Sequence, residues 1–154
     1  MKSDNSSRVR RPTAKARPPV ETAVASRRVV SVDLPPEPSS ATRARQLARE
    51  HVAECPAAVI DTVALLVTEL VTNAVVHGRG PISVRTVLDP VSLRVEVQDT
   101  ASDLPHRIDA DQARDGGRGL AIVDAFSREW GCTVVRGASG KSVWFTMERH
   151  EAPS

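Results

Sequence analysis

Three polar residues interrupt the mostly apolar segment 65–78, and their types could hold a metal ion and accept a proton. Glu69, Asn73 and His77 follow one another at intervals of four residues. On a helix this spacing places all three side chains on one stripe. An asparagine carbonyl is a hard oxygen ligand that suits Mg²⁺, and a nearby glutamate can accept a proton. The stripe indicates either a site that faces a metal–phosphate ligand or a plain solvent-facing edge of the helix.

A second acidic residue, Asp99, ends the run Val95-Glu96-Val97-Gln98, which reads as a strand with one apolar face. A carboxylate in that place could accept a hydrogen bond from an exocyclic amine such as N6 of adenine. The alternative is a turn in which the Asp99 side chain caps the backbone between Thr100 and Ser102. The residue by itself does not decide between these two interpretations.

Two glycine-containing segments follow. The run Asp115-Gly116-Gly117-Arg118-Gly119-Leu120 opens a predicted helix, and free N–H groups at a helix N-terminus bind phosphate, which glycine allows to approach closely. The run is not a Walker motif, because no Gly-Lys-Ser/Thr follows it, and it does not follow a strand as a dinucleotide fingerprint does. The second segment, 140–142, is a turn that enters the last predicted strand. Without a ligand, the first segment would be an ordinary loop before a helix and the second an ordinary hairpin turn.

Hydrophobic patterning predicts the elements that carry these motifs. Ser39 or Ser40 would cap the first helix, Pro56 would lie in the first turn of the second, and Gly78 would end it. The expected order is a strand at 29–34, a helix at 40–54, a helix at 56–77, strands at 82–88 and 92–98, a helix at 118–130, and strands at 132–136 and 142–147.

The two middle strands alternate cleanly between apolar and polar residues, which indicates one buried face. The inward positions are Ile82, Val84, Thr86, Leu88, Leu93, Val95 and Val97. The polar segment from about 100 to 115 is too long for a simple turn, and a segment of that length is usually functional. The order of elements predicts an α+β fold, a two-layer α/β sandwich with helices on one face of a mixed, mainly antiparallel sheet.

Charge and composition divide the chain into a tail and a domain. Residues 1–28 carry eight Lys or Arg against two acidic residues, and the remainder carries 13 basic and 17 acidic side chains. Residues 1–28 hold too little apolar surface to offset the entropy of ordering, so they are interpreted as a disordered basic tail. That tail has no aromatic side chain to stack on a base, and we do not expect direct nucleic-acid binding. The domain would span 29–148, followed by a short tail at 149–154.

The same composition argues for a cytoplasmic protein without a membrane partner. No run approaches the roughly 18 consecutive apolar residues of a membrane span. Pro18 and Pro19 lie where a signal peptide needs an apolar run. The two cysteines, Cys55 and Cys132, have no metal-ligand spacing, and we interpret them as small hydrophobic side chains in a reducing compartment.

In this order the four motifs resemble the nucleotide site of the GHKL superfamily, which includes gyrase, the heat-shock chaperone, histidine kinases and the mismatch-repair ATPases. Glu69-x-x-x-Asn73 is similar to its N box, Asp99 to the start of its first glycine box, and Gly117-x-Gly119 to its second. The segment 140–142 is similar to the threonine or serine element beside the adenine. The resemblance covers about residues 29–148 and implies a fold of the GHKL, or Bergerat, type.

Within that superfamily the chain most resembles the bacterial anti-sigma-factor serine kinases. The run Thr-Glu-Leu-Val-Thr-Asn-Ala-Val-x-His-Gly and the closing Gly-Lys-Ser-Val-Trp-Phe carry this resemblance. It implies that Asn73 ligates Mg²⁺, that Glu69 is the general base toward a serine hydroxyl, and that residues 100–116 form a lid over ATP. The nucleotide-binding residues that it implies are Asn73, His77, Asp99, Ala101, Gly117, Arg118, Gly119, Leu120 and Ser142.

One position departs from the family pattern. The first glycine box normally reads Asp-x-Gly, but residue 101 is alanine. A Cβ at that position could crowd the purine or strain a positive φ angle, which would reduce affinity. The sequence therefore supports ATP binding more strongly than it supports turnover.

The resemblance implies a specific function. The chain would bind Mg·ATP and act as an anti-sigma factor, or a related switch, that phosphorylates a serine on a small antagonist protein. Its partners would be a sigma factor, the antagonist, or both, and family members often form homodimers. The alternative is a nucleotide-sensing adaptor that holds protein partners without transferring phosphate, which the alanine at residue 101 favours and the intact Glu69 opposes.

Overall fold

Helices and strands follow one another along the chain in the order that the hydrophobic pattern predicts. The computed structural model describes residues 27–101, 118–134 and 140–150. Within these ranges the elements are β1 (Arg28–Leu34), α1 (Ser39–His51), α2 (Ala57–His77), β2 (Ile82–Leu88), β3 (Ser92–Asp99), α4 (Arg118–Phe126), β4 (Glu129–Val134) and β5 (Lys141–Glu148).

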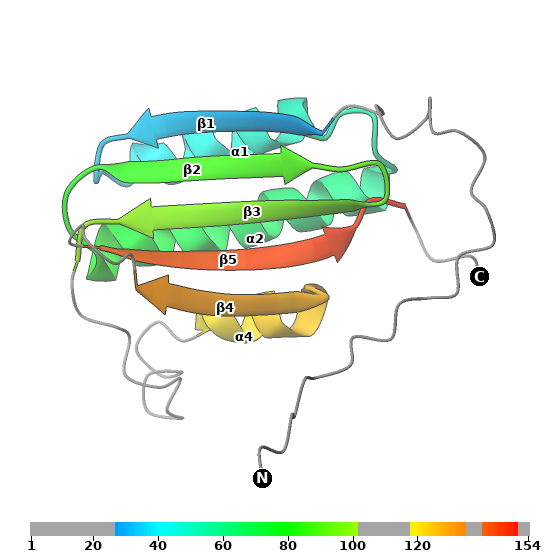
Figure 1. The fold of residues 1–154 in the computed structure, drawn as a ribbon. Helices are drawn as coiled ribbons and strands as arrows, with labels where there is room; N and C mark the ends of the chain where they lie inside the picture. The colour runs from blue at the N-terminus through cyan, green and yellow to red at the C-terminus, as the bar shows by residue number, and fades with distance from the viewer. Residues whose placement is uncertain (1–26, 102–117, 135–139, 151–154) are drawn as a thin grey trace, which may run out of the picture.

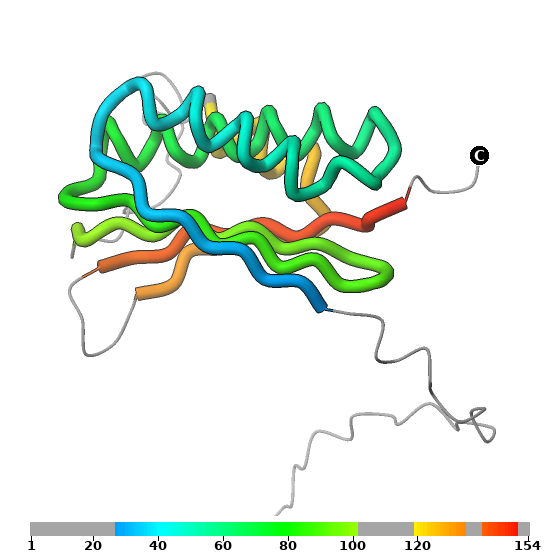
Figure 2. Tube along the Cα trace, turned by 90° about the horizontal axis from the view of Figure 1, so that it is seen from above, coloured from blue at the N-terminus to red at the C-terminus, as the bar shows by residue number. Residues whose placement is uncertain are grey.

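The strands form one five-stranded sheet in the order β1-β2-β3-β5-β4 (Figure 1). Strand β5 lies between β3 and β4, so among the described strands β4 occupies an edge of the sheet and pairs with β5. We expected a mixed, mainly antiparallel sheet, and every pairing among the described strands is antiparallel. The helices all cover one face of the sheet (Figure 2). The predicted α+β sandwich of two layers is confirmed.

The core lies between the sheet and the helices. All seven positions that we expected to face inward on β2 and β3 are buried, and Phe145 of β5 is fully buried beside them. Helix α2 is long and apolar enough to cross a membrane by length and composition alone. Its side chains Leu66 and Leu70, however, belong to the buried cluster between the helices and the sheet. It is therefore the core helix of this domain.

The start of α1 differs from the expectation. The residue before its first turn is Pro38, and no side chain caps the helix. Ser40 is already helical and buried, and its hydroxyl donates to the Pro35 carbonyl over 2.6 Å. The predicted serine cap at Ser39 or Ser40 is therefore wrong, because the Ser40 hydroxyl stabilises the preceding proline turn instead.

Helix α4 is shorter than predicted. It ends at Phe126 rather than near Trp130, and β4 begins at Glu129 rather than at Cys132. Trp130 already pairs with Phe145 in the β4–β5 ladder, and its indole N–H donates to Asp124 of α4 over 2.8 Å. The pairing with Phe145 requires extended backbone at Trp130, so the helix ends earlier than its apolar spacing suggests.

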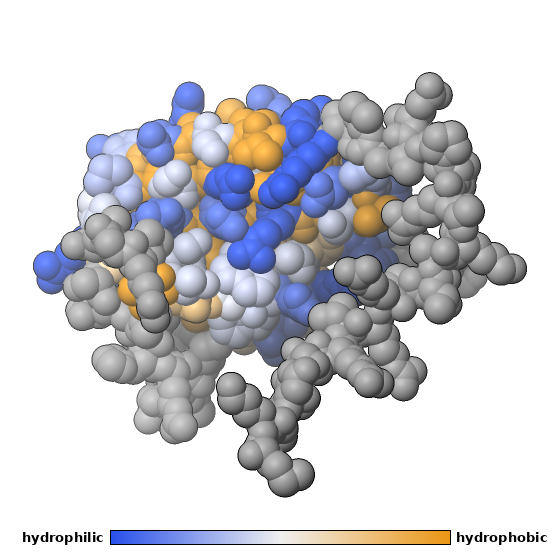
Figure 3. Space-filling model, in the orientation of Figure 1, coloured by the Kyte–Doolittle hydropathy of each residue, from blue (hydrophilic) through white to orange (hydrophobic). Residues whose placement is uncertain are grey.

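The sheet face away from the helices is covered by charged side chains and one aromatic side chain. The Arg94 guanidinium lies 4.0 Å from the centre of a Trp144 ring, and it donates to Glu96 over 2.8 Å. Glu96 also forms an ion pair with Arg85 at 3.6 Å. Hydrophilic side chains accordingly run across this face in Figure 3. The pairs are partly exposed, so each contributes little to stability.

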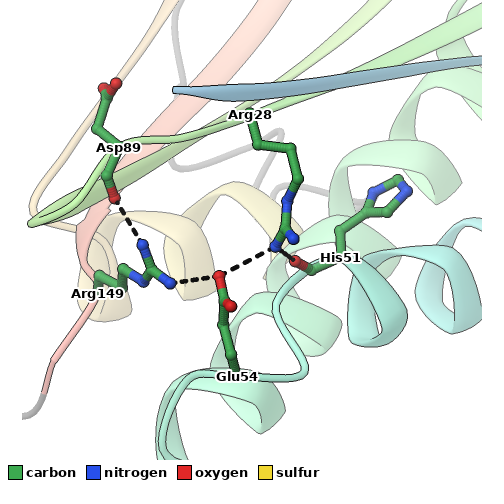
Figure 4. Close-up of polar contacts among 5 residues, drawn as sticks. All are labelled: Arg28, His51, Glu54, Asp89 and Arg149. Atoms are coloured by element: carbon green, nitrogen blue, oxygen red, sulfur yellow. Dashed lines mark hydrogen bonds and ion pairs between the residues drawn. The ribbon is translucent and has the colours of Figure 1, made fainter. Parts of the chain in front are cut away.

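At one end of the sandwich, two arginines hold the loop between α1 and α2 (Figure 4). Arg28 donates to Glu54 over 3.1 Å and to the His51 carbonyl over 2.8 Å. Arg149 also donates to Glu54, and it bonds the Asp89 carbonyl in the β2–β3 turn over 3.2 Å. These contacts connect the start of β1, the helix loop, the hairpin turn and the residue after β5.

At the opposite end, the turn after α2 packs directly on the end of β3. The backbone N–H and the hydroxyl of Thr100 both donate to the Arg79 carbonyl, over 2.8 Å and 2.6 Å. A Cβ at Gly78 would collide with the Ala74 carbonyl and lie 2.7 Å from Oδ2 of Asp99. The helix can approach the strand this closely only because residue 78 is glycine.

We therefore predict that Gly78→Ala destabilises the fold. The added methyl group has rigid backbone on one side and a buried carboxylate on the other, and overpacking of this kind costs about 1–3 kcal/mol. Urea unfolding would measure the change. Arg79→Ala is the matched control, because Thr100 bonds the backbone of Arg79 and the Arg79 side chain is exposed. Equal stability of the two variants would contradict the close approach.

A second prediction concerns pH. Burial, followed by the charge of Arg28, lowers the pKa of His51, and Glu50 opposes the shift in part. The pKa of His51 is lower in the folded chain than in the unfolded chain. As the pH falls through about 6.5, the ordinary pKa of histidine, the unfolded chain therefore takes up the proton first. The free energy of unfolding should be highest above that pH and should decline below it. His51→Gln should flatten this decline between pH 7 and pH 5 in urea titrations. An unchanged slope would exclude His51 as its source.

Candidate functional site

Glu69 and Asn73 lie on the part of α2 that α4 approaches. Both side chains are half-buried, whereas His77, at the last residue of α2, is exposed. A Cβ at Gly119 would lie 2.8 Å from Oε2 of Glu69 and 3.4 Å from its Cβ. The first turn of α4 therefore covers the Glu69 side chain. The stripe is a plain solvent-facing edge only at its His77 end.

This packing depends on the small size of Gly119. A Cβ at that position would push the end of the Glu69 side chain aside, so glycine allows the start of α4 to approach the carboxylate most closely. N–H groups in the first turn of a helix have no partner within the helix and attract anions. The structure thus brings the glutamate of α2 next to the helix start from which we expected phosphate binding.

Asp99 is the last residue of β3 and is buried. Its Oδ1 accepts the Ala101 N–H over 2.7 Å, which is the turn-forming arrangement that we considered as one alternative. Its Oδ2 faces the other way and lies 3.8 Å from Nζ of Lys141. The turn interaction occupies one oxygen only, so it does not exclude a ligand at the other.

Lys141 lies beside Asp99, and the sequence reasoning did not single it out. It is the first residue of β5, it pairs in register with Asp99, and only 4% of it is exposed. Burying a charge is costly unless an opposite charge compensates for it, so the ammonium and the Asp99 carboxylate stabilise each other. The signal was present in the sequence, because Lys141 continues the inward alternation of Val143 and Phe145.

Ser142 is not brought together with these groups. It pairs with Gln98 in the ladder, and the alternation of side chains along a strand directs it to the face opposite Lys141 and Asp99. Gly140, by contrast, belongs to the site end of the sheet. A Cβ at Gly140 would lie 2.5 Å from the Asp99 carbonyl oxygen, so the turn into β5 also requires glycine.

The remaining predicted residues are at the start of α4 or before it. Leu120 is buried in the hydrophobic core, so only its backbone N–H could contact a ligand. Arg118 begins the helix, and the structure describes its backbone alone. Gly117 and most of the expected lid, residues 102–116, lie outside the described residues.

Cys132 lies on the inner face of β4, near the charged pair. Burial raises the pKa of its thiol, the charge of Lys141 lowers it by a smaller amount, and the charge of Asp99 raises it. The thiol therefore stays protonated at neutral pH, and a protonated thiol is a poor nucleophile. This agrees with the interpretation of the cysteine as a small apolar side chain.

The described groups suit a nucleotide with a bound divalent cation. Helix α2 carries a half-buried amide and a half-buried carboxylate, the start of α4 packs against that carboxylate, and the buried Asp99–Lys141 pair lies where the turn after α2 meets the sheet. Gly78, which follows the last residue of α2, packs directly against Asp99. Such a site offers oxygen ligands for Mg²⁺, N–H donors for phosphate and a buried acceptor for an amine.

Comparisons with known proteins agree with this arrangement. Residues 34–147 match the family described as the histidine kinase-like ATPase domain. The crystal structure of the RsbU and RsbW domains of Rv1364c from Mycobacterium tuberculosis has a similar fold, with a TM-score of 0.60 and 22% identity over 82% of this chain. This chain spans 35% of the length of that one. No curated protein shows a significant match.

The family match covers both the N-box stripe on α2 and the strand end that carries Asp99. At 22% identity the likeness to the mycobacterial structure is one of fold, and it agrees with the two-layer arrangement described above. The expectation that the sequence belongs to the GHKL superfamily is confirmed. The chain belongs to the histidine kinase-like ATPase family.

Proposed function

We propose that this protein binds Mg·ATP at the site end of the sandwich and transfers the γ-phosphoryl group to a serine of a small antagonist protein. The observation that carries the proposal is the packing of Gly119 against Glu69, because it joins the acidic residue of the N box to the phosphate-binding helix start. In this role the protein is an anti-sigma factor or a related cytoplasmic switch, and its partners are a sigma factor, the antagonist, or both.

Asn73 is the residue that would hold the metal ion. Mg²⁺ keeps several waters and takes one or two protein oxygens together with phosphate oxygens, so a single amide at this position is sufficient. When bound, the ion would neutralise charge on the phosphate groups. The N–H groups at the start of α4 would hold the phosphates in place, and the buried Asp99 would accept from the adenine amine.

Glu69 would remove the proton from the attacking serine. It lies one helical turn before Asn73, so its carboxylate is near the terminal phosphate that the metal orients. As the serine oxygen bonds to the γ-phosphorus, the bond to the bridging oxygen breaks, ADP departs, and the hydroxyl proton passes to Glu69. Most of the acceleration in such a transfer comes from positioning and charge neutralisation rather than from covalent chemistry.

An adaptor that binds nucleotide and partner without phosphoryl transfer is the second candidate. The observation that favours it is the alanine at residue 101, where the first glycine box of the family has glycine. In the adaptor, the ATP-dependent position of α4 against α2 would regulate partner binding directly. The two candidates share the nucleotide site and differ only in the use of Glu69.

The metal assignment predicts that Asn73→Ala loses the magnesium-dependent part of ATP binding. Calorimetric titrations with MgCl₂ and with EDTA measure that part as a difference in affinity. The matched control is Thr72→Ala, because Thr72 is the preceding residue on α2 and is exposed. Equal magnesium dependence in the Asn73 variant and the wild type would remove Asn73 from the metal site.

The base assignment predicts that Glu69→Gln keeps ATP binding and loses phosphoryl transfer. Glutamine preserves size and hydrogen bonding but cannot accept the proton, and loss of a general base typically slows a reaction by about 10²–10⁴-fold. The assay uses radiolabelled ATP and the antagonist that copurifies with the protein, with binding measured in parallel. If the wild type transfers no phosphate while ATP changes partner affinity, the protein is the adaptor.

A further inference from the structure

We infer that the hydrogen bond between Trp130 and Asp124 positions α4 for phosphate binding, which makes Trp130 a positioning residue of the nucleotide site. The inference rests on the proposed function, in which the start of α4 holds the phosphates, and it adds a residue that lies outside the sequence motifs. The indole N–H of Trp130 donates to Oδ1 of Asp124 over 2.8 Å. This bond joins the last turn of α4 to the beginning of β4.

Helix α4 is held on its inner side by packing contacts. Leu120 and Val123 are buried in the core, and Gly119 lies against the carboxylate of Glu69. The burial of apolar side chains is non-directional, whereas a hydrogen bond prefers one distance and one angle. The bond at Asp124 therefore supplies a directional contact that fixes the rotation and tilt of the helix.

The donor of this bond is held firmly by the sheet. Trp130 pairs with Phe145 in the β4–β5 ladder, and side chains directly opposite each other in an antiparallel pair lie on the same face. Phe145 is fully buried, so the Trp130 ring lies on the face that the helices cover, where it packs against the core (Figure 2). The acceptor, Asp124, is an exposed residue one helical turn after Leu120. The bond therefore ties the exposed side of the helix to a fixed point on the sheet.

The start and the end of α4 are parts of one short helix. It has nine residues, and Asp124 follows Gly119 by about 7.5 Å along the helix axis. A helix of this length moves as a unit, so a rotation or tilt at Asp124 also displaces the N–H groups of the first turn. Those N–H groups would hold the phosphates in the proposed function. The Trp130 bond thus acts on phosphate binding through α4, without touching the ligand.

A purely structural role for the bond makes a different prediction. If the bond only stabilises the fold, its loss should lower the free energy of unfolding and leave the ligand affinities of the folded chain unchanged. If it positions the start of α4, its loss should weaken the binding of ATP and leave unchanged the binding of adenosine, which has no phosphate. The ratio of the two affinities separates the two roles.

The experiment measures the affinity of the full chain, with Mg²⁺, for ATP and for adenosine. We expect Trp130→Phe and Asp124→Leu each to weaken ATP binding about three- to tenfold, the range for one lost hydrogen bond, and to leave adenosine binding unchanged. Asp124→Asn should keep the wild-type ratio, because its amide oxygen still accepts from the indole. The double variant Trp130→Phe with Asp124→Leu should lose no more than either single variant. The control is Trp144→Phe, which removes the indole that lies against Arg94 on the other face of the sheet.

Three results would overturn the inference. Equal weakening of ATP and adenosine by Asp124→Leu assigns the bond to the stability of the whole site. Identical behaviour of Asp124→Asn and Asp124→Leu shows that the hydrogen bond is not the cause. Because Asp124 is exposed, these two comparisons do not depend on the folding of Trp130→Phe. If the wild type binds ATP and no variant changes the ratio, the inference fails while the nucleotide site stands, whereas a wild type that binds no ATP contradicts the proposed function itself.

Discussion

Helix α2 must bury an almost wholly apolar surface while it carries a glutamate and an asparagine, and the rest of the structure depends on this constraint. The sheet and α1 cover most of its apolar residues, although Leu65 and Val76 remain exposed, and α4 packs against the part of the helix that carries Glu69. A bulky residue at the start of α4 would force the glutamate out of that contact, and glycine avoids this. The position of the start of α4 thus depends on the packing of the core helix.

The two ends of the sandwich are stabilised in different ways. One end is held by arginines that connect loops and chain ends through exposed and half-exposed groups (Figure 4). The other end is assembled by close backbone approach at Gly78 and Gly140 around the buried Asp99. Long flexible side chains tolerate substitution, whereas contacts that require glycine do not. The end that carries the candidate site therefore tolerates fewer substitutions than the end held by the arginines.

Periodicity was sufficient to predict the elements that pack on the core. The alternation on β2 and β3 predicted their buried residues correctly, and the apolar run of α2 predicted its length. The boundary of α4 was wrong because Trp130 fits either a helix or a strand by spacing, and only its ladder partner Phe145 decides. The serine cap was wrong because Pro35 offers the Ser40 hydroxyl a competing acceptor.

The site was predictable only in part. Motif order indicated Glu69, Asn73, Asp99 and Gly119, and the structure packs Gly119 against Glu69 and the glycine after α2 against Asp99. Lys141 was not singled out, although it continues the inward alternation of β5, because only the register of β5 against β3 shows that it lies opposite Asp99. The same register directs Ser142 to the opposite face. A motif specifies residue types in order, but sheet pairing decides which side chain of a neighbouring pair faces the ligand.

The position of β5 also affects how the chain can fold as it is synthesised. β5 is the last strand in the sequence but lies inside the sheet, between β3 and β4. Until it emerges from the ribosome, β3 keeps an unpaired edge and β4 has no partner among the described strands. Unpaired edges are sites of aggregation and of chaperone binding. Because β5 also carries Lys141, the sheet and the charged pair at its end are completed in the same late step.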